Sequence, residues 1–420
     1  MWLQPDFGGA TIGPQPLATP APEPLAAVHI RVRLAEAAPG VSIHGYDLTI
    51  REHSEHGKTV GPPFEKSFDR TSSWEIRCQD GFVRAIQGGG KQSLELKAPI
   101  SIESQGGFLL FHGKPYREEI RVFSNGSLCE VVNVLDLEKY LDGLVNAEFS
   151  SNWNSEAIAA QVVAARTYAL YQIRMATQEA GSHFDVDATT KDQVYDGSIK
   201  EDYRASRSVD RTRGLVLGVQ VAQNGFMPLK AFYHSTCGGV TELPENVWGR
   251  RQAGFKHPVR CPFCNHSPVF HWELDLNSND ITEALLRGGK LDGIQPGWPR
   301  NWLQVLRSGT LTDVQPGALD AAGRVSKTVT VWSFTNRLIE LPVPGAKFRE
   351  WIGAGKLRSM AFQIVPQRGL ASNHWHLEGH GNGHGVGMCQ WGAKIMGEKG
   401  YKMAAILRLY YPDAILRKLW

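Results

Sequence analysis

The stretch LEKYLDGLVNAEFSSNWNSEAIAAQVVAARTYAL, residues 137–170, decides the fold. Its first part repeats apolar residues at the i, i+3, i+4 spacing of an amphipathic helix, and Asp136 precedes it as an N-cap. After the break AEFSSNWN, a second helix is predicted from about Ser155 to Glu179, with Asn154 as its cap. Because AIAAQVVAARTYAL is apolar on nearly every face, this helix should be buried. The sequence therefore predicts a buried pair of helices.

Strand-like alternation surrounds this helical pair. The runs HIRVRL, VSIHGYDLTI and LELKAPISI, punctuated by Gly and Pro, predict a β-rich segment over 28–120 that follows a flexible Pro/Gly/Ala-rich lead-in over 1–27. Similar patterns return at GLVLGV, PLKAFYHS, SKTVTVWSF and MAFQIV, and short helices close the chain. The expected class is α+β, with a second domain over 121–420 that contains a polar, Gly-rich insertion at 275–325.

The bulk composition excludes several classes of protein. The 420 residues carry 45 basic and 42 acidic side chains, and this near balance gives no case for a nucleic-acid partner. No run of about 18 apolar residues is present, so no membrane span is predicted. The N-terminus lacks the basic and apolar regions of a secretory signal. Six cysteines are too few and too scattered to predict a disulfide scaffold.

Glu148 is the first candidate for chemistry, because it falls in the break between the two predicted helices. Its neighbours Ala147, Phe149 and Trp153 would partly desolvate the carboxyl group, which raises its pKa and favours the protonated form. The C-terminal end of a helix also disfavours negative charge. Both effects suit a general acid at neutral pH. The alternative is a helix-end carboxylate that caps the next helix or pairs with an arginine.

Arg166 is a charged residue within an otherwise apolar helix. A buried guanidinium must be paired, so a carboxylate partner is implied. The side chain either joins the helix to its neighbours or orients Glu148 or a sugar, and both interpretations stay open.

Four residues have the spacing of a metal site: His234, Cys237, Cys261 and Cys264. Two ligand pairs, each separated by two residues, match tetrahedral zinc, and four protein ligands leave no open position, which indicates a structural role. His257 and His266 are nearby substitutes for the histidine. The alternatives are an oxidised pair of Cys261 with Cys264, or unrelated thiols.

The Gly-rich stretch GHGNGHGVGMCQWGA, residues 379–393, allows close backbone approach. Its histidines, His380 and His384, could bind substrate or hydrogen-bond the backbone. It lacks the GK[ST] ending of a phosphate-binding loop. Cys389 is a thiol nucleophile or, as free cysteines usually are, a small buried residue in a tight turn.

These residues carry a resemblance to the SpoIID/LytB family of stage II sporulation protein D and its relatives. The matching stretches follow the family's order: LEKYLDGLVNAEFSSNWNSEAIAAQVVAARTYAL, DQVYDG at 192–197, AFYHSTCGGVTE at 231–242, KFREWIGAGKLRSMAFQI at 347–364 and GHGVGMCQWGAKIMGEKGYKMAAILRLYYPDA at 383–414. The resemblance implies a β-rich fold whose buried helical pair carries the active site. The chain departs from the family in its N-terminus, which has no visible anchor or signal, and in the 275–325 insertion.

The resemblance also implies an activity, that of a lytic transglycosylase that cleaves peptidoglycan strands and leaves 1,6-anhydro ends. The family's catalytic glutamate falls on Glu148 and the arginine of its AARTYA stretch on Arg166. Zinc, bound by a histidine and cysteines in some members, falls on the His234 group. Asp185, Asp187 and Asp192 are possible helpers of Glu148. Within the matching stretches we expect substrate contacts from Gln193, Tyr195, Ser235, His380, His384 and Gln390.

The expected partners are glycan strands, including strands stripped of stem peptides, and a cell-wall amidase or other wall-remodelling protein. The expected location is periplasmic, extracellular or cell-wall associated. Two other functions compete: a non-catalytic glycan-binding enhancer of an amidase, and a zinc hydrolase that uses the His/Cys group.

Overall fold

The computed structural model describes residues 27–53, 65–90, 92–179, 181–221, 225–365 and 373–420. The lead-in predicted over 1–27 lies outside the described residues, apart from residue 27. Strands and helices both contribute extensively, and the predicted α+β class is confirmed. Among the described helices, none has the length and apolar character needed to cross a membrane.

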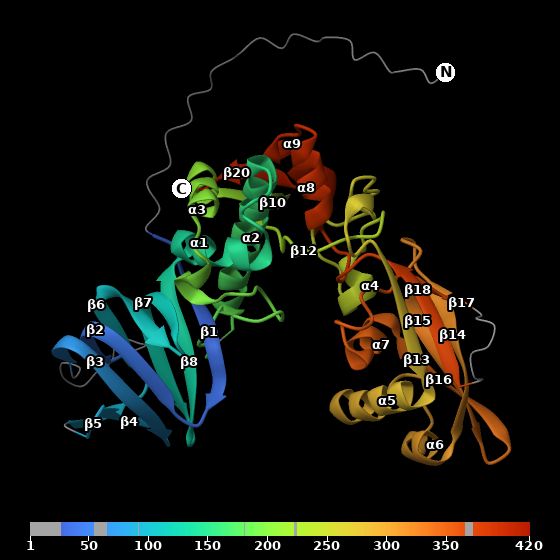
Figure 1. The fold of residues 1–420 in the computed structure, drawn as a ribbon, viewed down its shortest axis with the longest axis horizontal. Helices are drawn as coiled ribbons and strands as arrows, with labels where there is room; N and C mark the ends of the chain where they lie inside the picture. The colour runs from blue at the N-terminus through green and yellow to red at the C-terminus, as the bar shows by residue number, and fades with distance from the viewer. Residues whose placement is uncertain (1–26, 54–64, 91, 180, 222–224, 366–372) are drawn as a thin grey trace, which may run out of the picture.

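A nine-stranded sheet forms the N-terminal part of the chain, in the order β5-β4-β3-β2-β6-β7-β8-β1-β9 (Figure 1). Inward-facing residues such as Ile43, Ile50 and Trp74 are fully buried and alternate with exposed neighbours, as expected for a sheet with one covered face. All neighbouring strands are antiparallel except β1 and β9. The strands are β1 (His29–Ala38), β2 (Val41–Glu52), β3 (Glu65–Gln79), β4 (Phe82–Gln87), β5 (Ser93–Lys97), β6 (Ile100–Phe111), β7 (Lys114–Asn125), β8 (Leu128–Asp136) and β9 (Val186–Asp187).

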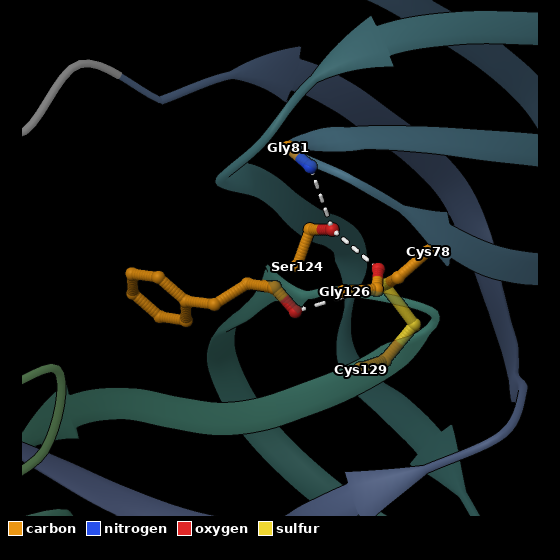
Figure 2. The surroundings of a disulfide bond; sticks show 6 residues. Cys78, Gly81, Ser124, Gly126 and Cys129 are labelled. Atoms are coloured by element: carbon orange, nitrogen blue, oxygen red, sulfur yellow. Dashed lines mark hydrogen bonds between the residues drawn. A yellow bond between two sulfur atoms is a disulfide. The ribbon is translucent and has the colours of Figure 1, made fainter.

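A disulfide joins two strands that are not neighbours in this sheet. Cys78 of β3 is bonded to Cys129 of β8, although β2, β6 and β7 lie between them in the strand order. The turn after β3 also bonds to the end of β7, because Gly81 donates its N–H to Ser124 Oγ at 3.1 Å (Figure 2). The sheet therefore curls back on itself, and the disulfide joins β3 to β8 across the curl. The sequence predicted no disulfide at this position.

The predicted helical pair follows the sheet. Helix α1 (Leu137–Glu148) begins at the Asp136 cap, whose carboxylate accepts the N–H groups of the first turn. Helix α2 (Ser155–Ala176) begins at the Asn154 cap and is buried along most of its length. It ends three residues before the predicted Glu179. The hydrophobic core of the sheet continues onto both helices, so they are fixed on rigid structure.

Further short elements follow along the chain, and several of them, among them α3, β10, α8 and α9, pack against α2 in the upper part of Figure 1. A three-stranded sheet has the order β11-β10-β20, and β12 pairs with β19 in parallel. These elements are η1 (Gly197–Lys200), α3 (Tyr203–Arg211), β10 (Leu215–Val221), β11 (Gly225–Pro228), β12 (Tyr233–His234), α4 (Pro244–Trp248), η2 (Cys264–His266), β19 (Met388–Cys389), α8 (Gln390–Glu398), α9 (Met403–Tyr410) and β20 (Ile415–Lys418).

The remaining residues form an outer lobe, His271–His380, at the right of Figure 1. It has its own core, which includes Trp298, Trp302 and Trp332, and its first and last residues, His271 and His380, lie opposite each other in paired strands. Its elements are β13 (His271–Asn277), α5 (Ser278–Asp292), α6 (Trp302–Ser308), β14 (Thr310–Leu319), β15 (Val325–Phe334), β16 (Arg337–Pro344), α7 (Gly345–Ile352), β17 (Phe362–Val365) and β18 (His374–His380).

This outer lobe differs from the polar insertion predicted over 275–325. The folded unit is longer, and the tryptophans of that segment face its interior. The helices within 275–325 bury only one face each, so polar residues and glycines remain common in this segment. Its average composition therefore does not reveal the core of the outer lobe.

Candidate functional site

Glu148 is the last residue of α1, where the chain leaves the helix for the break that precedes α2. The side chain is half-buried, and its Oε1 accepts the N–H of Val194 at 2.5 Å. Burial raises the pKa of the Glu148 carboxyl above its ordinary value of 4.5, although the Val194 hydrogen bond acts in the opposite direction. The carboxyl is therefore held by one backbone donor and shifted toward its protonated form.

Glu148 opens into a cleft of about 590 Å³. The walls come from three parts of the chain that are far apart in sequence: the end of α1 with the following break, the end of η1, and the segment where β12 and β19 lead into α8. Among the described residues that line this cleft, Glu148 is the only carboxylate. The lining residues are Asn146, Ala147, Glu148, Phe149, Ser150, Trp153, Lys200, Ser235, Gln390 and Trp391.

Two tryptophans give the cleft an aromatic wall. Trp153 and Trp391 have ring centroids 5.2 Å apart, and Phe149 packs against Trp153 at 4.4 Å. The ammonium group of Lys394 lies over both indoles, at 5.7 and 5.0 Å from their centroids. Flat aromatic faces with polar edges are suited to the apolar faces and hydroxyl groups of a sugar ring.

Backbone geometry sets these walls close to Glu148. The Gln390 side chain donates to the Glu148 backbone oxygen at 3.2 Å, which ties the start of α8 to the end of α1. On the other side, a Cβ at Gly143 would lie 2.3 Å from the carbonyl oxygen of Gly197. Only glycine permits that approach of α1 to η1, the element that ends at Lys200.

A buried hydrogen-bond chain lies behind Glu148. The Tyr140 hydroxyl donates to Gln193 Oε1 at 3.1 Å, and Gln193 Nε2 donates to the Tyr233 hydroxyl at 3.0 Å. Burial, followed by the nearby charge of Glu148, raises the pKa of Tyr233 well above its ordinary value. Tyr233 therefore stays a neutral phenol next to the carboxyl group.

Two expected substrate contacts belong to this interior. Gln193 is fully buried within the chain just described. Tyr195 is 3% exposed, and its hydroxyl donates to Asn133 at 3.2 Å. The structure places both side chains in the core, where they support the floor of the cleft.

Arg166 is fully buried and forms an ion pair with Glu138, at 2.6 Å between Nη2 and Oε2. Its Nε also bonds Glu138, and Nη1 and Nη2 reach Thr212 Oγ1 and the carbonyl oxygens of Leu215 and Val209. A guanidinium has five N–H donors, and these contacts engage all three nitrogens. Of the two interpretations left open by the sequence, the contacts favour the structural one, since they leave no donor for Glu148 or a sugar.

The expected helper carboxylates are also engaged elsewhere. Asp185 pairs with Arg31 at 2.7 Å and Asp187 pairs with Arg33 at 2.8 Å. Asp192 accepts hydrogen bonds from Tyr168 and Gln172. None of the three lines the cleft around Glu148.

Four buried cysteines form a compact group: Cys237, Cys261, Cys264 and Cys389 have sulfur atoms within 4.8 Å of one another. Sulfur atoms around a tetrahedral zinc, with bonds of about 2.3 Å, are about 3.8 Å apart. The donor set and its spacing therefore fit such an ion. Backbone N–H groups of Cys237 and Gly392 both point to the Cys389 sulfur at 3.3 Å, as suits a thiolate ligand.

This group differs from the ligand set predicted from sequence, because it contains Cys389 and leaves out His234. The His234 ring is buried, its Nδ1 lies 3.1 Å from the Val386 oxygen, and its Nε2 has no partner among the described residues. The parallel pairing of β12 with β19 sets His234 opposite Cys389 in the register and carries Cys389 to the other cysteines. Sequence spacing cannot reveal a ligand that arrives from 125 residues beyond Cys264.

The cysteine group adjoins the cleft. Gln390 and Trp391 directly follow Cys389, and Ser235 lies two residues before Cys237. A Cβ at Gly392 would lie 2.7 Å from the Cys261 sulfur, so glycine is needed where α8 passes the group. An ion held by the four sulfurs would fix the wall that faces Glu148.

The two remaining histidines lie away from the cleft. His380 ends β18 and packs against Phe270 and His271. His384 accepts the Val386 N–H at 3.0 Å, and burial lowers its pKa to about 3. Neither side chain lines the cleft, so the structure does not support the substrate contacts expected of them.

Of the predicted site residues, the structure brings together Glu148, Ser235 and Gln390. Sequence reasoning missed Trp391 and Lys200 as cleft residues. Trp391 could have been predicted from sequence, because it stands next to Gln390 in the Gly-rich stretch. Lys200 could not have been predicted, because its position depends on the packing of η1 against α1.

Comparison with known proteins identifies the family to which this chain is related. A sequence profile described as Stage II sporulation protein matches residues 125–218, which hold α1, the Glu148 break and α2. The chain is also 30% identical to an uncharacterized protein of Brachyspira hyodysenteriae over 315 residues, 75% of each chain. This chain belongs to the SpoIID family.

Two Bacillus subtilis proteins are also similar to this chain in sequence. Stage II sporulation protein D is 26% identical over 310 residues, 68% of this chain and 78% of that protein. The amidase enhancer is 27% identical over 300 residues, 66% of this chain but only 40% of that protein. SpoIID membership associates the chain with the bacterial cell wall.

Proposed function

We propose that this chain cleaves the glycan strands of peptidoglycan as a lytic transglycosylase, with Glu148 as acid and then as base. The observation that carries the proposal is a single half-buried carboxyl group, shifted toward its protonated form, at an aromatic-walled cleft. A strand would lie along Trp153 and Trp391 with its scissile bond at Glu148.

The reaction needs only one carboxyl group. Glu148 would give its proton to the glycosidic oxygen on the leaving side of an N-acetylmuramic acid residue, and the bond from that oxygen to C1 breaks. The C6 hydroxyl of the same residue then attacks C1 and returns its proton to Glu148. A 1,6-anhydro ring forms, no water is consumed, and the enzyme ends in its starting state.

The absence of a second carboxylate from the described cleft lining supports this route over simple hydrolysis. Glycosidases of the usual kind place two carboxyl groups across the scissile bond, about 5–9.5 Å apart. The cleft around Glu148 offers Lys200, Ser235 and Gln390 in addition, and none of these is a second acid.

We also propose that the four cysteines hold a structural zinc ion. Four thiolates complete a tetrahedral shell and leave no position for water or substrate, so an ion there would stabilise the wall of the cleft and take no part in bond cleavage. This arrangement disfavours the zinc hydrolase considered from the sequence.

The proposed site of action is outside the cytoplasm. The Cys78–Cys129 disulfide supports this, because such bonds form and persist chiefly in oxidising compartments.

A second function is favoured by one comparison. The amidase enhancer relative raises the case of a chain that binds glycan and promotes a separate amidase without cutting. The cleft would then be a binding groove, and the pKa shift of Glu148 a by-product of its burial.

Mass spectrometry of products from defined glycan strands tests the proposal. Wild-type protein should release 1,6-anhydro ends, and Glu148→Gln should reduce the rate by about 10²–10⁴-fold, as for loss of a general acid. The exposed Glu95→Gln on β5 is the control and should cleave normally. Strand binding without any soluble product would favour the enhancer, and hydrolysed reducing ends would refute the transglycosylase.

A further inference from the structure

A second hollow, of about 390 Å³, adjoins the cleft and plays no part in the mechanism above. It lies between α3 and the break that leads into α2. Trp153 lines both this hollow and the Glu148 cleft, so the two are neighbours on one surface. Its lining residues are Ser151, Trp153, Ser155, Ile158, Tyr203, Arg204, Arg207, Ser208 and Arg211.

The charge of this hollow is one-sided. Three arginines from α3 line it, and no carboxylate is among its described lining residues. Arg211 is neutralised by Glu156 at 2.8 Å. Arg204 donates to the neutral Asn152 at 2.9 Å, and no hydrogen bond or ion pair within the described residues engages the Arg207 side chain. Two guanidinium groups therefore face the hollow without a counter-charge.

Helix stability does not account for this pattern. Arg204, Arg207 and Arg211 are three and four residues apart, so they share one face of α3. Like charges at these spacings destabilise a helix by a few tenths of a kcal/mol. A different face meets the core through the buried Ala205 and Val209, so the arginine side chains are not needed for packing.

The flanking groups suit an anion attached to something larger. Hydroxyl groups of Ser151 and Ser155 lie in the lining, and Tyr203 is 76% exposed at the rim. The arginine fork matches a carboxylate with two parallel hydrogen bonds. Lys200, in the neighbouring cleft, extends the positive charge toward Glu148.

We propose that the α3 hollow is a subsite that binds a carboxylate carried by the glycan strand lying in the cleft. This inference rests on the proposed function. Such a carboxylate has two sources: the lactyl group of a muramic acid residue without its peptide, or the acidic groups of an attached stem peptide. Either would be held by Arg204 and Arg207 while the sugar rings pass Trp153.

The test measures dissociation constants of soluble oligomers for the full chain carrying Glu148→Gln, which blocks turnover. Three oligomers are compared: a neutral N-acetylglucosamine oligomer, a peptide-stripped strand with free lactyl carboxylates, and a strand bearing stem peptides. The paired change Arg204→Gln with Arg207→Gln should weaken a carboxylate-bearing oligomer about tenfold, the scale of charge-assisted hydrogen bonds. Binding of the neutral oligomer should not change.

Arg213→Gln provides the matched control, because Arg213 is an exposed arginine just beyond α3 that does not line the hollow. It should leave all three constants unchanged. Weakening with the peptide-stripped strand identifies the lactyl carboxylate, and weakening only with the peptide-bearing strand identifies the stem peptide. Equal weakening of the neutral oligomer, or no weakening at all, would overturn the subsite.

Cleavage measured in parallel, with Glu148 restored, separates this inference from the proposed function. Arginine-dependent binding without release of anhydro products refutes the transglycosylase and leaves the subsite standing. If cleavage is normal and the dissociation constants do not change when Arg204 and Arg207 are replaced, only the subsite is refuted.

Discussion

Glu148 is the residue at which stability and function oppose each other. Its carboxyl pKa is raised by burial, so the folded state holds the proton more tightly than the unfolded state. Stability from this group is full below the unfolded pKa and is lost as the pH rises through the folded pKa. We therefore expect Glu148→Gln to be more stable than wild type at pH 7 and to match it near pH 4.

Urea unfolding at several pH values measures this difference, with Glu95→Gln as a control that should show no such divergence. A variant that is equally stable, or less stable, at pH 7 would contradict the account of Glu148 as a desolvated acid. The cleavage rate of the wild type should also fall as the pH rises, because Glu148 then loses the proton that it donates as general acid.

Cys389 and His234 supply the second prediction, since sequence spacing and structure assign the fourth metal ligand differently. We expect purified wild-type protein to hold about one zinc ion per chain. Cys389→Ser should lose it, because one of four sulfur ligands is removed. His234→Gln should keep it, because the ring lies outside the group. Metal analysis of the three proteins distinguishes the two ligand sets. Loss of zinc from His234→Gln and its retention by Cys389→Ser would show that His234 is the fourth ligand.

Residue identity was read from sequence with mixed success. The sequence singled out Glu148 because its helical break and apolar neighbours are local features, and the structure places it in the cleft. Cys237, Cys261 and Cys264 were singled out because ligand pairs have short spacings, and the structure brings their sulfur atoms together. Cys389 could not be assigned, since its role depends on the pairing of β12 with β19. Gln193 and Tyr195 were placed at the substrate because nothing in their local sequence reveals that they face inward.

At the scale of elements, the Arg166–Glu138 pair joins α2 to α1. Removing one partner from a buried pair leaves an uncompensated charge, which typically costs about 3–5 kcal/mol. We expect that loss for Arg166→Met in denaturant unfolding. The double change Arg166→Met with Glu138→Leu should recover part of it, because no charge is then left unpaired. A fully stable Arg166→Met that has lost only its cleavage activity would instead indicate a direct role in chemistry.

The helices themselves were predictable, and the reasons are local. Asp136 and Asn154 cap α1 and α2 as predicted, since short polar side chains before an apolar run satisfy the first N–H groups. The end of α2 was placed three residues late, where polar residues continue without a strong stop. The sequence predicted a polar, Gly-rich insertion over 275–325 within this lobe and did not reveal its core, because that core forms only after β13 pairs with β18, about 100 residues away.

At the scale of the whole molecule, the Cys78–Cys129 disulfide is the feature with the largest expected effect on stability. It spans 51 residues, and the loop-entropy relation gives about 4 kcal/mol for a closure of that length. The double change Cys78→Ser with Cys129→Ser should therefore lower the free energy of unfolding of the N-terminal sheet by about 2–4 kcal/mol.

Thermal unfolding of this variant, with and without a reductant, provides the measurement. Wild type should fall toward the variant when reduced, and the variant's N-terminal sheet should not respond. If the variant and the wild type are equally stable without reductant, the disulfide does not stabilise the curled sheet.

No sequence rule would have paired these two cysteines. Cys78 and Cys129 approach only because the sheet curls far enough to bring β3 over β8, and curvature of this kind arises from the twist of all the intervening strands. The individual strands were visible as alternating runs, and their closure was not.

The same closure gives the protein a mechanical property. A protein attached to a stretched polymer such as a glycan strand is subject to tension. Under tension its polypeptide lengthens as the β-strands separate. The disulfide keeps the 50 residues between Cys78 and Cys129 from being stretched when the ends of the chain are pulled. It therefore withholds about 170 Å of extension until the sulfur–sulfur bond is reduced. A force-extension trace of the oxidised protein should therefore end short of the reduced one by about that length.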